Sequence, residues 1–99
     1  MILFFTGRWC VPCRIMKRNV WADEQVTSLA NAGFVAVTID VGDPGAAAVM
    51  SRYHVGATAN TIITDSHGEV RQQKEGGMGK ADFLGMLAKV NPTSVPSKP

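Results

Sequence analysis

The chain has 99 residues, of which 45% are hydrophobic and 18% are charged, and its formal net charge at pH 7 is +2. This length fits one small domain with a thin core, and the composition is neither that of a disordered chain nor that of a membrane protein. No apolar run approaches the roughly 18 residues of a membrane span, and so small a charge implies neither a nucleic-acid nor a membrane partner. We expect one folded domain over residues 1–90 and a disordered tail over residues 91–99.

The first half of the chain predicts a strand, a helical region and a second strand. Residues 2–6 are β-branched and aromatic, as in a buried strand. Apolar residues at helical spacing then predict one bent or broken helical region over about residues 11–32, in which Asp23 caps a fresh segment. Residues 34–40 predict a second strand, whose continuous apolar character favours a central, parallel position in a sheet.

The second half predicts a short helix, a hairpin and a last helix. The short helix covers residues 46–52, and Gly42-Asp43-Pro44 supplies its N-cap and its first-turn proline. Residues 61–64 and 69–74 predict an antiparallel hairpin, with the second of these strands at an edge of the sheet. A helix follows over residues 80–90. The expected fold class is therefore α/β: a four-stranded mixed sheet, built as βαβ and then ββα, with helices on both faces.

Cys10 and Cys13 form a Cys-x-x-Cys motif between the first strand and the helix that follows it. The loop between them is too short for a disulfide to remove much unfolded-state entropy, so a reversible redox pair or half of a metal site remains. Cys10 lies at the predicted helix start, where unpaired backbone N–H groups and the helix dipole favour thiolate over thiol. Cys13 lies one turn further in. We therefore expect Cys10 to attack a partner disulfide and Cys13 to resolve the mixed disulfide.

The segment Trp9-Cys10-Val11-Pro12-Cys13-Arg14 after an apolar strand resembles the active site of thioredoxins. The segments Phe5–Trp9 and Asp23–Val26 are closer to thioredoxin-like domains of the type found at the C-terminus of the disulfide-relay protein DsbD. The resemblance covers about residues 2–90. It implies a minimal thioredoxin fold and a thiol–disulfide oxidoreductase that exchanges with protein thiols and disulfides, served by an upstream redox partner, without a cofactor or a bound metal.

The resemblance also implies which residues surround the cysteines. Trp9, Val11 and Pro12 would contact the substrate beside the motif, and Thr58 and Ala59 would do so from the loop before the third strand. For Trp9, packing against the start of the helix is an equal alternative. Among the other aromatic side chains, Trp21 is interpreted as part of the core. The cations that follow the motif form either a solvated helix face or a surface that attracts acidic partners. These cations are Arg14, Lys17 and Arg18.

Three departures from the family pattern stand out. The chain opens in its central strand, without the N-terminal strand and helix of the family, which fits either a minimal version or a fragment. Phe4 stands where thioredoxins carry a buried Asp that moves a proton to or from the resolving cysteine. Ala59 stands where the family has a cis-proline, and a cis bond costs about 2.5–4 kcal/mol before alanine but only about 0.5–1 kcal/mol before proline. We therefore expect a trans bond between Thr58 and Ala59.

The missing proline leaves a second class of function open. By resemblance, the proline keeps metals away from the cysteines, so a domain without it could bind zinc or an iron–sulfur cluster with two cysteines from each of two chains. It could also be a redox-inert adaptor. His54 and His67 are weak candidates for metal ligands, because only the cysteines are certain to be adjacent. We expect a monomer, in the cytoplasm as the sequence stands, or in the bacterial envelope if it is a fragment of a longer precursor.

Overall fold

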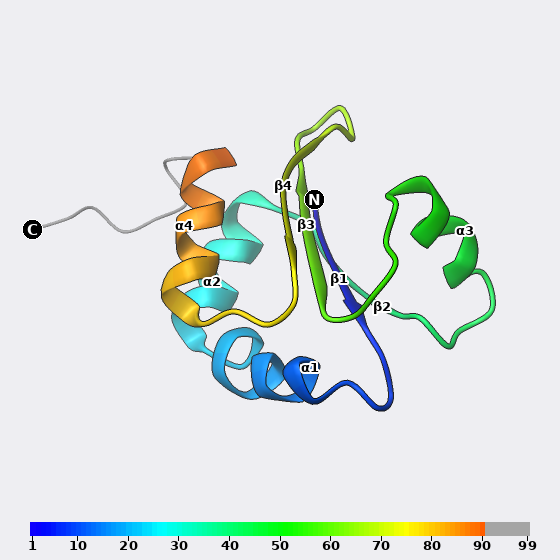
Figure 1. Ribbon diagram of the computed structural model, residues 1–99. Helices are drawn as coiled ribbons and strands as arrows, with labels where there is room; N and C mark the ends of the chain where they lie inside the picture. Colours follow the sequence, from blue (N-terminus) through cyan, green and yellow to red (C-terminus); the bar gives the residue numbers. More distant parts are fainter. Residues whose placement is uncertain (91–99) are drawn as a thin grey trace, which may run out of the picture.

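The computed structural model describes residues 1–90, and the disordered tail predicted for residues 91–99 lies outside the described residues. One four-stranded sheet lies between two unequal layers of helices (Figure 1). The strands are β1 (Ile2–Thr6), β2 (Ala36–Asp40), β3 (Asn60–Thr64) and β4 (Val70–Glu75). The helices are α1 (Val11–Met16), the π-helical segment η1 (Lys17–Trp21), α2 (Glu24–Gly33), α3 (Ala46–Arg52) and α4 (Lys80–Val90).

The strands are arranged in the order β2-β1-β3-β4. β1 is parallel to β2 and antiparallel to β3, and β3 and β4 form an antiparallel hairpin. α1, η1, α2 and α4 pack on one face of the sheet, and α3 packs on the other (Figure 1). The predicted mixed sheet, built as βαβ and then ββα with helices on both faces, is therefore confirmed. In the described part of the chain, no helix is long and apolar enough to cross a bilayer.

The predicted central position of the second strand was wrong, because β2 lies at an edge of the sheet and β1 lies at its centre. All five residues of β1 are buried, whereas most of β2 is exposed. The apolar character of β2 comes partly from the face that α3 covers, where Ile39 packs in the smaller cluster and pairs with Phe5 of β1. A parallel strand with a neighbour on one side only can have the same apolar composition as a central strand, so composition does not settle its position.

The predicted cap of α3 was also wrong. The helix begins at Ala46 as expected, but its N-cap is Gly45, whose φ of 89° lies in the left-handed region that favours glycine. The backbone carbonyl of Asp43 accepts a hydrogen bond from the N–H of Ala46 at 3.1 Å. Asp43 and Pro44 therefore form a turn ahead of the helix, which is the other structure that Asp-Pro pairs favour.

Two apolar clusters, one on each face, hold the helices against the sheet. The larger cluster lies under α1, η1, α2 and α4, and it includes Phe4, Cys13 and Phe83. Trp21 packs between Phe4 and Phe83, with ring centroids 5.1 Å and 4.7 Å apart respectively. The prediction that Trp21 belongs to the core is therefore confirmed. Both cysteines are consequently part of the same cluster that stabilises the fold.

Replacing Phe83 by alanine should lower the free energy of unfolding by about 3–5 kcal/mol, because its ring is fully buried and packs edge-on against Trp21. Urea unfolding followed by circular dichroism measures this loss. Val35→Ala, at an exposed position just before β2, is the control and should change the free energy by no more than about 0.5 kcal/mol. Equal losses in the two variants would contradict the assigned core.

Asp23 confirms the predicted break in the helical region, because it caps α2 directly after η1. Its Oδ1 accepts a hydrogen bond from the backbone N–H of Val26 at 3.1 Å, and its Oδ2 lies 3.1 Å from the Nζ of Lys80, the first residue of α4. The hydrogen bond from Val26 and then that from Lys80 lower the pKa of Asp23 below its ordinary value of 3.8. The carboxylate therefore stabilises α2 and joins it to α4.

The lowered pKa of Asp23 makes stability depend on acidity. The ionised carboxylate stabilises the fold above its unfolded pKa of 3.8, and this contribution is lost as the pH falls through the lower pKa of the folded chain. Asp23→Asn keeps a capping oxygen but carries no charge, so it should be less stable than wild type at neutral pH and should lose less stability in acid. Urea midpoints measured from about pH 6 down to about pH 2 test this, and parallel curves for the two proteins would refute it.

Candidate active site

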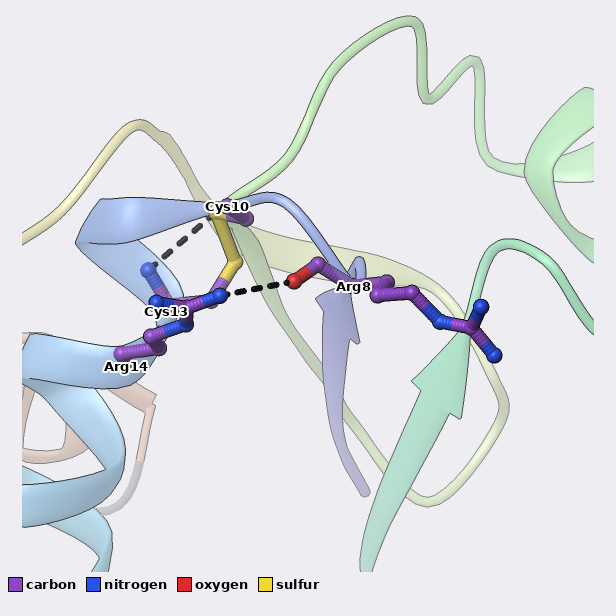
Figure 2. Close-up of a disulfide and its surroundings, with 4 residues drawn as sticks. All are labelled: Arg8, Cys10, Cys13 and Arg14. Carbon is purple, nitrogen blue, oxygen red and sulfur yellow. Dashed lines mark hydrogen bonds between the residues drawn. A yellow bond between two sulfur atoms is a disulfide. The ribbon is translucent and has the colours of Figure 1, made fainter.

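Cys10 and Cys13 lie where β1 leads into α1, and a disulfide joins them (Figure 2). The N–H of Cys10 donates to the carbonyl of Gly7 at 3.3 Å, in the turn that follows β1. Cys10 is the N-cap of α1, and its Sγ accepts a hydrogen bond from the N–H of Cys13 at 3.2 Å. Pro12 lies in the first turn, where its missing N–H leaves no hydrogen bond unmade. The spacing of the motif therefore matches the geometry of an N-cap, in which a side chain accepts a hydrogen bond from the backbone N–H three residues later.

The two cysteines differ in their access to solvent. Cys10 is 8% exposed and lines an open hollow of about 540 Å³, whereas Cys13 is 1% exposed and packs in the larger apolar cluster. The other residues that line this hollow are Gly7, Arg8, Trp9, Val11, Pro12, Val41 and Thr58. A partner sulfur that enters the hollow therefore meets Cys10 first.

Arg14 spans the motif from its C-terminal side. Its Nη2 donates a hydrogen bond to the backbone carbonyl of Arg8 at 3.2 Å, so the residues that flank the two cysteines are joined directly (Figure 2). This contact holds a guanidinium close to the first turn of α1. When the disulfide is reduced, this positive charge and the N–H of Cys13, which donates to the Sγ of Cys10, favour a thiolate at Cys10.

The loop before β3 forms a second wall of the site. Thr58 lines the hollow beside Cys10, and Ala59 is fully buried in the same cluster as both cysteines. The Thr58–Ala59 peptide bond is cis, so the predicted trans bond was wrong. That prediction weighed only the intrinsic preference of a bond before alanine. In the fold, Ala59 is also fixed by its neighbours, because its carbonyl accepts a hydrogen bond from Gly76 at 2.7 Å and Asn60 begins β3.

Phe4 provides no acid or base near the buried cysteine. Its ring lies in the cluster that contains Cys13, and in the register of β1 and β3 it stands opposite Thr61. The hydroxyl of Thr61 is buried and has no hydrogen-bond partner within the described residues. The sequence analysis did not single out Thr61, because a buried hydroxyl becomes conspicuous only when the strand register is known.

The histidines are not brought to the cysteines. His67 lies in the exposed turn between β3 and β4, where its backbone N–H donates to Asp65 at 2.9 Å. His54 lies exposed after α3, with a positive φ of 58°. Within residues 1–90, no three His, Cys, Asp or Glu side chains gather where they could hold a metal ion.

Comparison with known proteins agrees with this geometry. A family model described as thioredoxin-like matches residues 1–73, which is most of the chain. The chain belongs to the thioredoxin-like family. The thiol-disulfide oxidoreductase ResA of Geobacillus kaustophilus is 25% identical over 112 aligned positions, which cover 93% of this chain and 63% of the relative. This thioredoxin-like chain therefore spans less than two thirds of the length of that relative.

Solved structures share the fold of this thioredoxin-like chain. A thioredoxin from Thermus thermophilus superposes with a TM-score of 0.76 and 27% identity, over 90% of this chain and 71% of the other. The reduced C-terminal domain of DsbD from Neisseria meningitidis superposes with a TM-score of 0.79 and 18% identity, over 92% of this chain and 80% of the other. The predicted thioredoxin fold and the resemblance to the DsbD type are both confirmed.

Gly77 makes a contact with the motif that the sequence analysis missed. A Cβ placed on Gly77, in the loop between β4 and α4, would lie 3.2 Å from the Cβ of Pro12. Three of the four residues 76–79 are glycine, a composition typical of a flexible link. The neighbouring Gly79 has open space around it, so sequence does not distinguish the glycine that packs on the site from the one that does not.

Gly77→Ala should slow the reduction of the Cys10–Cys13 disulfide by dithiothreitol about threefold, because the added methyl group displaces Pro12 in the turn that positions both sulfurs. Stopped-flow measurement of disulfide reduction gives the rate. Gly79→Ala is the matched control, since its methyl group meets nothing within 4 Å, and it should react like wild type. Equal rates in the two variants would show that the contact with Pro12 does not control the site.

Proposed function

We propose that this chain is a thiol–disulfide oxidoreductase in which Cys10 and Cys13 alternate between a disulfide and a dithiol. One observation carries the proposal: the disulfide lies at the start of α1, with Cys10 lining an open hollow and Cys13 almost fully buried. The relative ResA, which is named for this activity, supports it. The two sulfurs carry both electrons, so the exchange needs no cofactor and no metal.

In the reducing direction, the Cys10 thiolate attacks one sulfur of a partner disulfide. A new disulfide bond forms between Cys10 and the partner as the partner's own bond breaks, and the second partner sulfur leaves as a thiolate that takes up a proton. Cys13, once deprotonated, then attacks the sulfur of Cys10 and releases the first partner sulfur. The partner gains two electrons and the Cys10–Cys13 pair loses two. An upstream dithiol protein restores the pair by the same steps.

We further propose that the walls of the hollow contact the partner chain. Trp9 is 84% exposed and Val11 is 59% exposed, so a docked protein can cover both side chains, and Pro12, which lines the same hollow, is also exposed. Thr58 faces the same hollow from the other wall. Ala59 is fully buried, so its contribution is to the shape and backbone of that wall.

Serine substitutions separate the roles of the two cysteines. Cys10→Ser should abolish exchange with a protein disulfide, because the attacking sulfur is gone. Cys13→Ser should stop after the first step and accumulate a mixed disulfide with the partner, because nothing resolves it. Non-reducing electrophoresis and mass spectrometry after reaction with a disulfide-bonded protein distinguish these outcomes. Full turnover by both variants would refute the mechanism.

The direction of exchange and the compartment depend on the reduction potential of the pair. A potential near the thioredoxin value of about −270 mV fits a reductant in the cytoplasm, and a value near about −120 mV fits an oxidant in the envelope. The absence of any reversible transition would instead favour the adaptor or metal-binding alternative.

We propose that the chain acts as a monomer, because both sulfurs come from one chain. Light scattering that gave twice the chain mass would contradict this.

A further inference from the structure

Charge is distributed unevenly along the chain. Residues 1–22 contain four cationic side chains and no acidic one, whereas the residues that follow contain six Lys or Arg and eight Asp or Glu. The four cations are Arg8, Arg14, Lys17 and Arg18. All four are exposed, and within residues 1–90 neither of the two ion pairs includes any of them. Their charge is therefore available to a ligand.

These cations lie around the disulfide and along the helix that follows it. Arg8 precedes the motif, and Arg14 reaches back to the carbonyl of Arg8 across the cysteines (Figure 2). Lys17 and Arg18 follow in η1, three and four residues after Arg14. Residues three and four apart on a helix are neighbours on its surface, so three of the positive charges form one continuous patch.

Exposed apolar side chains lie beside this patch. Val11 is 59% exposed and Ile15 is 51% exposed, and their spacing of four residues places them on one side of α1. A hollow of about 310 Å³, lined in part by Pro12, Ile15 and Met78, adjoins them. Apolar surface that is ringed by charge and lies next to a reactive group is typical of a protein docking site.

The opposite side of the motif carries mixed charge. A hollow of about 470 Å³ beside Arg8 and Trp9 is also lined by Asp40 and Asp43, from the segment that follows β2. A carboxylate of a docked protein would meet two like charges and one cation there, whereas over α1 and η1 it would meet only cations. The site therefore has a polarity, with its cationic side on the helix.

We propose that the α1–η1 face, defined as Val11, Arg14, Ile15, Lys17 and Arg18, docks an acidic segment of the protein whose disulfide or dithiol is exchanged. The inference rests on the proposed function, because it names the class of partner for that same site. Carboxylates of the partner pair with the cations while its apolar side chains cover Val11 and Ile15. An anionic membrane would satisfy the same charges, but it would also cover the hollow beside Cys10 and keep a partner sulfur out. A protein segment that itself carries the reacting sulfur therefore fits better.

The test uses short synthetic peptides that each contain one internal disulfide, flanked by pairs of Glu, Gln or Lys. The reduced protein should react about tenfold faster with the Glu peptide than with the Lys peptide at low salt. The ratio should fall towards one at about 0.5 M salt, where the charges are screened. The Gln peptide reports exchange that does not depend on charge.

Lys17→Glu/Arg18→Glu is the decisive variant, because these side chains carry the patch without touching the motif. It should abolish or invert the ratio of the Glu and Lys peptide rates. Arg52→Glu/Lys89→Glu is the control, and it changes the net charge by the same amount. Arg52 is the last residue of α3 and Lys89 lies in the last turn of α4, and neither helix lines the hollow beside Cys10. This variant should keep the wild-type ratio. Reading a ratio removes any common effect of folding on the two rates.

The possible failures are distinguishable. No reaction with any peptide would refute the proposed function itself. Reaction without a charge preference, or an unchanged ratio in Lys17→Glu/Arg18→Glu, would refute the acidic partner while leaving the oxidoreductase intact. Loss of the preference in both double variants would show that net charge, and not this face, sets the rate. Binding of the wild type to phosphatidylglycerol vesicles without a peptide preference would identify the face as a membrane surface and overturn the proposal.

Discussion

The hydrogen bond from the N–H of Cys13 to the Sγ of Cys10 is the interaction on which the rest of the site depends. It makes one sulfur the cap of α1 and places the other one turn further in, against the core. The turn directly follows β1, which fixes its position because all five residues of this strand are buried and it lies between β2 and β3. A strand, a tight turn and a helix start therefore place two sulfurs within bonding distance, with Cys10 beside a hollow and Cys13 buried.

The same arrangement divides the work between the two sulfurs. Charge is stabilised at the helix start, close to the guanidinium of Arg14, whereas Cys13 is more deeply buried than Cys10 in the apolar cluster that they share. Developing charge is thus favoured at the sulfur that a partner can reach. The patch along α1 and η1 extends this polarity outward, so that the electrostatics that favour a thiolate at Cys10 also favour an acidic partner.

The sequence by itself determined the features that arise within a few neighbouring residues. The buried strand at residues 2–6, the break capped by Asp23 and the helix at residues 80–90 were all predicted, because each depends on local periodicity or on one capping side chain. The position of the cysteine pair followed for the same reason, since the motif, the strand before it and the helix after it are contiguous. The thioredoxin fold was implied by the resemblance of this motif and its neighbouring segments to a known family.

Only the tertiary structure decided the features that join distant segments. The edge position of β2 depends on which strands pair with β1, and the cis bond before Ala59 occurs where Gly76 and β3 enclose that residue. The contact of Gly77 with Pro12, and the burial of the Thr61 hydroxyl opposite Phe4, likewise join segments about sixty residues apart. Such contacts are set by packing across the sheet. The local propensity of one segment does not indicate which distant segment will lie beside it.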